Sequence, residues 1–154
     1  MNTEKFPFNH SKIRRALAYA LDRESIVNAA FEGIGHPAFG IISPCFDLTT
    51  DRQFEDHDLP RARALFDEAL EELGLTKETF PPIKLKCVAG SENLSRTIQI
   101  TQQNWQDAFG IKVEIDQADW PCHFSSIQKG ESIHETIDAL NLMGVDLCVL
   151  RHPD

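Results

Sequence analysis

The stretch IKLKCVAGSENLSRTIQITQQNWQDAFGIKVEID, residues 83–116, decides the fold class. Apolar and polar residues alternate at both of its ends, over residues 83–89 and 111–116, as they do in half-buried β-strands. Between these ends, Ser91 can cap a helix that stops before Gly110. A strand, a helix and a second strand in this order predict a βαβ unit, in which the two strands lie parallel in one sheet.

A third strand is predicted over residues 145–150, because an almost continuous apolar sequence suits the interior of a parallel sheet. A helix over residues 132–143 precedes it. We expect this strand to lie beside residues 111–116 and to cover an edge that would otherwise be open to other chains. The predicted fold class is α/β, with a parallel or mixed sheet of about three core strands (83–89, 111–116, 145–150) and helices packed around it. The length of 154 residues suits a single domain, 1–154.

The rest of the chain contains further predicted helices and one loop. Apolar residues at helical spacing predict one long amphipathic helix over residues 9–33. An Asp-Leu-Pro start and a closing glycine predict a helix over residues 58–74. The irregular sequence of residues 35–57 is expected to form an extended surface loop. An aspartate can cap a short helix near residues 119–128.

Four large side chains are assigned to structural roles. Trp105 shares a helical face with Phe109, so we expect it in the core. Arg14, Arg15 and Arg23 resemble a basic cluster, but acidic residues lie near them at helical spacing. We therefore expect these arginines to be solvated or to pair within the molecule.

Composition and charge exclude several classes of protein. Hydrophobic residues make up 42% of the chain, as in globular proteins, and the formal net charge of −9 argues against a nucleic-acid partner. No apolar run is long enough to cross a bilayer, so no membrane insertion is expected. The first residues lack the pattern of a secretory signal, which predicts a cytoplasmic location for the chain as written.

Neither a metal nor another cofactor is expected from the sequence. The four cysteines, Cys45, Cys87, Cys122 and Cys148, lie far apart and form no CxxC pair, so we expect buried or half-buried thiols. The six histidines form no HExxH or HxH pattern. Any metal site would have to be assembled by the fold from distant residues.

Residues 8–26 read FNHSKIRRALAYALDRESI and resemble the stretch F-N-x-x-K-V-R-x-A-L-x-Y-A-I-D-R-x-x-I of the extracytoplasmic peptide-binding proteins of ABC importers. The resemblance continues through A-x-x-L-F-x-E-A-L at residues 62–70 and L-G-I-K-V-E-I-x-x-x-D-W at residues 109–120. It covers residues 8–130. The resemblance implies part of the C-terminal lobe of a periplasmic protein that clamps short peptides between two lobes. Short peptides are therefore the partners implied for the parent family.

Trp120 is the candidate ligand-binding residue of this segment, because it matches a tryptophan that faces the peptide cleft in that family. Packing within the lobe is the other role open to it. The resemblance also implies further cleft residues after Gly130, in a run x-F-D-x-x-x-x-G-W-x-x-D-x-x-x-P whose acidic residue receives the amino terminus of the peptide. This sequence does not contain that run, which predicts that ligand binding is not intact.

The tail resembles a different family. Residues 125–154 include SSIQKGESIHET and VLRHP, which are similar to a loop, helix and strand of aspartate carbamoyltransferases. The resemblance implies Ser125, Lys129 and Arg151 as phosphate ligands, and cationic donors do suit phosphate oxygens. The S-T-R-T-R helix start of those enzymes is missing, so we expect no catalytic residue and no enzyme activity.

The two resemblances predict a chimera, with a peptide-binding-protein-like segment over residues 8–130 and a carbamoyltransferase-like helix and strand over residues 131–154. The favoured function is a non-catalytic fragment or chimeric domain derived from an oligopeptide-binding protein, without intact ligand binding. The alternative is an aspartate carbamoyltransferase-derived fragment that still binds phosphate or carbamoyl phosphate. A homodimer through the exposed former interface is a further expectation.

Overall fold

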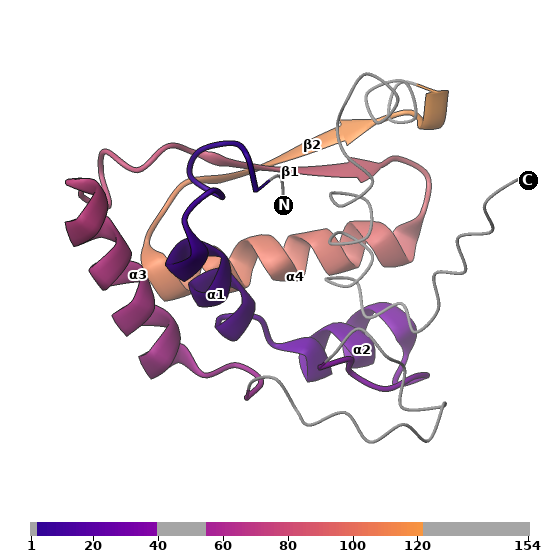
Figure 1. Cartoon of the computed structure of the whole chain (residues 1–154). Coiled ribbons are helices and arrows are strands. Elements are labelled where there is room, and N and C mark those ends of the chain that lie inside the picture. Colours follow the sequence, from indigo (N-terminus) through magenta and orange to yellow (C-terminus); the bar gives the residue numbers. More distant parts are fainter. Residues whose placement is uncertain (1–2, 40–54, 122–154) are drawn as a thin grey trace, which may run out of the picture.

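The computed structural model describes residues 3–39 and 55–121 (Figure 1). Figure 1 shows α4 running alongside the strands, on the same side of them as α1 and α2. The predicted α/β fold class is confirmed. The described elements follow in the order α1 (Ser11–Tyr19), α2 (Arg23–Phe31), α3 (Leu59–Leu73), β1 (Ile83–Val88), α4 (Glu92–Phe109) and β2 (Val113–Ala118).

β1 and β2 are parallel neighbours, paired from Ile83 opposite Val113 to Val88 opposite Ala118. α4 connects them, so the predicted βαβ unit is confirmed. Along β1 the apolar residues are mostly buried and the intervening lysines are exposed, which is the predicted alternation. The third strand predicted at residues 145–150, and the helix predicted before it, lie outside the described residues.

The prediction of a strand over residues 111–116 was wrong in its bounds. β2 starts at Val113 and ends at Ala118, so each end lies two residues later than predicted. Ile111 is buried, but it packs into the core before the ladder begins. The first ladder contact runs from the N–H of Ile83 to the carbonyl of Lys112, at 3.0 Å. Alternation indicates which residues face inward, whereas pairing with β1 decides where the strand begins.

The prediction of a single helix over residues 9–33 was wrong, because α1 ends at Tyr19 and α2 starts at Arg23. The carboxylate of Asp22 accepts hydrogen bonds from the backbone N–H of Ser25 at 2.8 Å and from the Ser25 hydroxyl at 2.6 Å. A capping aspartate has an extended backbone, so a helix cannot continue through it. The Asp22 cap therefore starts a new helix inside the predicted one.

Carbonyl groups at this break are bonded by residues from elsewhere in the chain. The indole N–H of Trp105 donates to the Leu17 carbonyl at 3.0 Å. The backbone N–H of His57 donates to the Leu21 carbonyl, also at 3.0 Å. These contacts join the break to α4 and to the segment before α3, so tertiary partners stabilise it.

α3 and α4 agree closely with the predicted helices, because their ends are determined locally. Asp58 and Ser91 cap them by accepting backbone N–H groups of the first turn at 3.1 and 3.4 Å. Gly74 and Gly110 end them with φ values of 63° and 68°, in the left-handed region that glycine enters without a steric penalty.

The core lies between the helices and the inner face of the sheet. Phe66 of α3 packs edge-on against Phe80, with ring centroids 5.1 Å apart, and stacks on Phe109 of α4 at 4.4 Å. Trp105 is 1% exposed, which confirms its predicted place in the core. Cys87 is buried, as predicted, and the other cysteines lie outside the described residues.

Candidate functional site

The two strands end at the same side of the sheet, because they run parallel. The N–H of Ala89, just after β1, donates to the carbonyl of Ala118 at 2.9 Å, so the chain leaves both strands at one place. Figure 1 shows the start of α4 on this side of the molecule. Open α/β sheets bind ligands beyond the carboxyl ends of their strands. We call this candidate site the carboxyl edge and define it by Ile34, Gly90, Ser91, Asn93 and Trp120.

Gly90 and Ser91 make the turn from β1 into α4. Gly90 has a φ of 100°, which a residue with a side chain rarely adopts. The hydroxyl of Ser91 accepts the N–H of Leu94, and its carbonyl accepts the N–H and the hydroxyl of Ser95 at 3.0 and 2.9 Å. The positive end of the α4 dipole therefore lies at the carboxyl edge, where it favours an anionic group.

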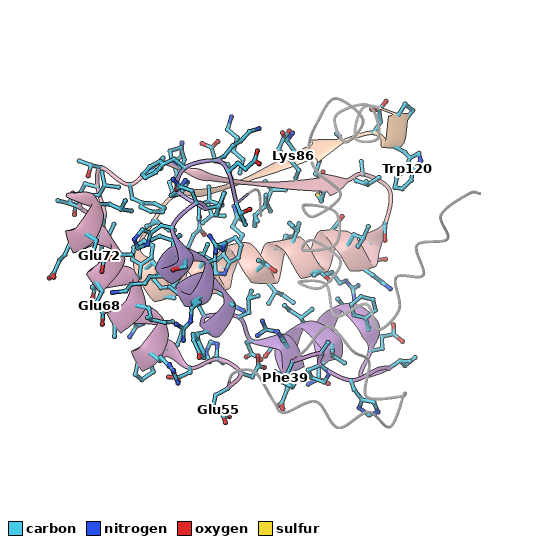
Figure 2. All side chains as sticks on the ribbon, in the orientation of Figure 1. Phe39, Glu55, Glu68, Glu72, Lys86 and Trp120 are labelled. Atoms are coloured by element: carbon cyan, nitrogen blue, oxygen red, sulfur yellow. The ribbon has the colours of Figure 1, made fainter. Side chains whose placement is uncertain are left out.

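Trp120 follows β2 almost directly and is 63% exposed (Figure 2). Its indole offers an apolar face and one N–H donor at the carboxyl edge. Trp120 and Pro121 have helical geometry, as predicted for a helix that Asp119 caps, and the rest of that helix lies outside the described residues. Contact with a ligand stays a prediction.

A surface depression of about 350 Å³ lies between the end of α2 and the first turn of α4. Ile34 at its rim is 78% exposed, and Glu32 ends α2 in the left-handed conformation with a φ of 54°. The lining of the depression combines apolar side chains with one carboxylate and one amide. Its lining residues are Ala30, Phe31, Glu32, Ile34 and Asn93.

Arg96 neutralises the acidic residue in the first turn of α4. One of its terminal nitrogens forms an ion pair with Glu92, and the other donates to the carbonyl of Ala29 at 3.2 Å. The second contact also ties the end of α2 to α4. The first turn of α4 therefore presents its dipole to the carboxyl edge with the charge of Glu92 compensated.

The described part of the chain shows no cluster of three or more histidine, cysteine or carboxylate side chains placed to hold a metal ion. Burial raises the pKa of the Cys87 thiol, which keeps this group protonated at neutral pH and unreactive. In the same described residues, no helix has both the length and the apolar character needed to cross a bilayer.

Of the four predicted site residues, the described part of the chain contains Trp120. Ser125, Lys129 and Arg151, the predicted phosphate ligands, lie outside it. Their roles stay predictions, and these three residues are not among those that define the carboxyl edge.

Comparison with known proteins identifies the family. The sequence profile of the bacterial extracellular solute-binding proteins, family 5 Middle, matches residues 1–137. The chain belongs to this family. It is 32% identical over 130 residues to the oligopeptide-binding protein OppA of Bacillus subtilis, across 82% of this chain and 24% of OppA.

Solved structures of solute-binding proteins share the fold. The oligopeptide-binding protein AppA of Bacillus subtilis, in complex with a nonapeptide, matches with a TM-score of 0.67 and 25% identity over 80% of this chain and 26% of AppA. The protein AgaA of A. tumefaciens R10, in complex with agropinic acid, matches with a TM-score of 0.68 and 30% identity over 84% of this chain and 26% of AgaA. This chain thus spans about a quarter of the length of these relatives.

Family membership confirms the resemblance found for residues 8–130 and extends it to residues 1–137. The match passes the predicted junction after Gly130, so it includes the start of the segment predicted to resemble a carbamoyltransferase. The proteins named above are solute-binding proteins, and the predicted fusion to an aspartate carbamoyltransferase finds no support. Family 5 solute-binding proteins are non-enzymatic components of transport, in agreement with the prediction of no enzyme activity.

The sequence indicated Trp120 but not the rest of the carboxyl edge. The sequence predicts Ser91 as a helix cap, although a glycine and a cap directly after a strand also mark a turn where ligands bind. Ile34 and Asn93 carry no comparable signal. They are far apart in the chain, and the packing of α2 on α4 brings them to one depression.

Proposed function

We propose that the carboxyl edge is one wall of a solute-binding cleft and that the solute is a short peptide. In this proposal the chain is a fragment whose opposite wall belongs to the rest of a longer solute-binding protein, because its relatives are about four times as long. With one wall, the chain loses most of the contacts that enclose a ligand. We therefore expect weak, millimolar binding by the chain alone.

The position of Trp120 carries the proposal. Its exposed indole lies beyond β2, on the side where β1 leads into the N-terminus of α4. An indole face packs well against an apolar peptide side chain, and a helix N-terminus attracts the carboxylate that ends a peptide. The depression beside Asn93 offers a second place for an apolar side chain. Short peptides carry both kinds of group.

Peptides are favoured over other solutes by the relatives. OppA and AppA are named as oligopeptide-binding proteins, and AppA was solved with a nonapeptide. AgaA was solved with agropinic acid, so this fold accepts more than one kind of solute. Residues 8–26 and residues 109–120 resemble stretches of peptide-binding proteins, which supports a peptide as the solute.

The proposed place of action is outside the cytoplasm, in line with the description of the family as extracellular.

The test uses the two tryptophans, one as reporter and one as internal control. Mixed short peptides are titrated into ¹⁵N-labelled protein to about 10 mM, enough to detect millimolar dissociation constants. We expect the indole signal of Trp120 to shift progressively. The indole signal of Trp105 should stay in place, because that N–H is buried and bonded to Leu17.

Two controls sharpen the result. Trp120→Ala should reduce the peptide-induced shift of the backbone amide of Asn93. In the wild type, peptides with an amidated carboxyl end should shift this amide less than peptides with a free carboxylate do. An immobile Trp120 signal at the highest peptide concentration, or equal movement of both indoles, would refute the proposed wall.

A further inference from the structure

Arg23 stands out as a buried charge. Among the described residues it is the one charged side chain in the buried class, at 6% exposed. It is the first residue of α2, a place where a basic residue opposes the helix dipole. Both its burial and its position are unfavourable unless specific partners compensate them.

Asp56 is the main partner. The guanidinium of Arg23 contacts the Asp56 carboxylate at 2.9 Å, and the two side chains are 7% and 10% exposed. The same nitrogen donates to the carbonyl of Ala18 at 3.2 Å, at the break between α1 and α2. A buried ion pair with further hydrogen bonds holds its geometry more strictly than an exposed pair does.

Asp56 also acts on the start of α2 directly. Its second oxygen accepts the backbone N–H of Arg23 at 2.9 Å and of Glu24 at 3.3 Å. Asp22 accepts the N–H of Ser25. The first three N–H groups of α2 are therefore bonded by two carboxylates, one local and one from a distant part of the chain.

Phe39 is the third contact of the Arg23 guanidinium, which lies 5.9 Å from the centre of its ring. Phe39 and Asp56 stand on either side of residues 40–54, and the described residues next to them form no helix or strand, as predicted for a loop. One guanidinium thus contacts both flanks of this segment. Bringing Phe39 and Asp56 to one point costs chain entropy, and the contacts with Arg23 offset this cost.

We propose that Arg23 is a positioning residue that fastens both flanks of residues 40–54 to the first turn of α2. The inference does not depend on the proposed peptide site, because Arg23 is not part of the carboxyl edge. It assigns the buried ion pair a role in fixing one arrangement of the chain, which is the role buried pairs serve best.

Limited proteolysis with trypsin tests the proposal, because Arg52 is the single lysine or arginine among residues 40–54. Arg23→Met removes the charge and keeps much of the apolar stem. We expect cleavage after Arg52 to become faster by on the order of tenfold to a hundredfold, the factor that losing a buried charged hydrogen bond implies. Cleavage after Lys84, within β1, should keep its rate.

Arg14→Met is the matched control, since Arg14 is a half-buried arginine with one bond of 2.6 Å to the carbonyl of Phe8 and, within the described part of the chain, no contact with either flank. It should leave cleavage after Arg52 unchanged. Phe39→Ala releases one flank and should give a smaller acceleration than Arg23→Met. Arg23→Lys keeps the positive charge but lacks the planar guanidinium. Its rate of cleavage after Arg52 should therefore fall between those of the wild type and Arg23→Met.

An unchanged rate after Arg52 in Arg23→Met would overturn the proposal. An equal acceleration at Lys84 would do the same, since it would show that the variant loosens the whole fold. If Arg23→Met does not fold, Phe39→Ala and Arg23→Lys decide, and unchanged cleavage after Arg52 in both would again count against it.

Discussion

Replacing Trp105 with phenylalanine tests the contact that joins α4 to the break between α1 and α2. Trp105 is 1% exposed, and its indole N–H donates to the carbonyl of Leu17 at 3.0 Å. Leu17 is itself fully buried, so water cannot easily replace the lost donor. The change keeps a six-membered aromatic ring in the core. It removes the five-membered ring of the indole together with its N–H.

The expected loss has two parts. A buried carbonyl left without this donor costs about 1–3 kcal/mol of unfolding free energy. The space left by the smaller ring adds about 1–2 kcal/mol, because a packed core collapses only partly around it. We therefore expect Trp105→Phe to lower the free energy of unfolding by roughly 2–5 kcal/mol.

Urea unfolding followed by far-ultraviolet circular dichroism measures this loss without relying on tryptophan fluorescence. Trp120→Phe is the matched control, because that side chain is 63% exposed and should change stability by less than about 0.5 kcal/mol. The dependence on urea should stay the same in both variants. A loss below about 1 kcal/mol in Trp105→Phe would refute the reasoning, since it would mean that the Leu17 carbonyl needs no donor from α4.

Four further predictions concern the described contacts, the tail and the oligomeric state. The hydrogen bond from Lys12, at 2.8 Å, lowers the pKa of Glu72 below the usual 4.5, so its stabilising effect is present above pH 4.5 and is lost as the pH falls through the lowered pKa. In Lys12→Met, carboxyl ¹³C signals should show the pKa of Glu72 moving back up; no movement would contradict the assignment. Asp22→Ala should cost about 1 kcal/mol in urea unfolding, and Asp22→Asn clearly less, because the amide oxygen still caps α2. Deleting residues 131–154 should unfold or aggregate the rest of the chain, and sedimentation should show the intact chain as a dimer; an unchanged melt and a monomer would contradict the predicted single domain and homodimer.

The elements predicted most accurately are those with local end signals. α3 and α4 begin directly after their caps, Asp58 and Ser91, and end before Gly74 and Gly110, as the sequence indicated. A capping side chain acts on N–H groups two or three residues away, and glycine reaches the left-handed region by itself. Neither effect needs the rest of the fold, so both can be predicted from neighbouring residues.

The break between α1 and α2 shows the opposite case. Asp22 followed three residues later by Ser25 is a visible cap signal, but the apolar spacing on both sides favours a continuous helix. Trp105 and His57 stabilise the break, because they bond carbonyl groups there from distant parts of the chain. Hydrogen-bond partners that are far away in sequence leave no periodic pattern.

The same distinction applies to the carboxyl edge. The sequence predicted Trp120 as a site residue through a family motif, and the structure describes it as exposed at the end of β2. The depression formed by Ile34 and Asn93 could not be predicted, because neither residue belongs to a motif and they meet through the packing of α2 on α4.

By itself, the sequence determined the α/β class, the βαβ unit, the ends of α3 and α4 and the descent from peptide-binding proteins, since caps, alternation and motifs act over a few residues. The tertiary structure decided where β2 begins, that residues 11–31 form two helices and which residues share the carboxyl edge. Each of these depends on a partner from a distant segment. Whether an N–H or a carbonyl is bonded within its own helix or by such a partner is settled when the segments pack.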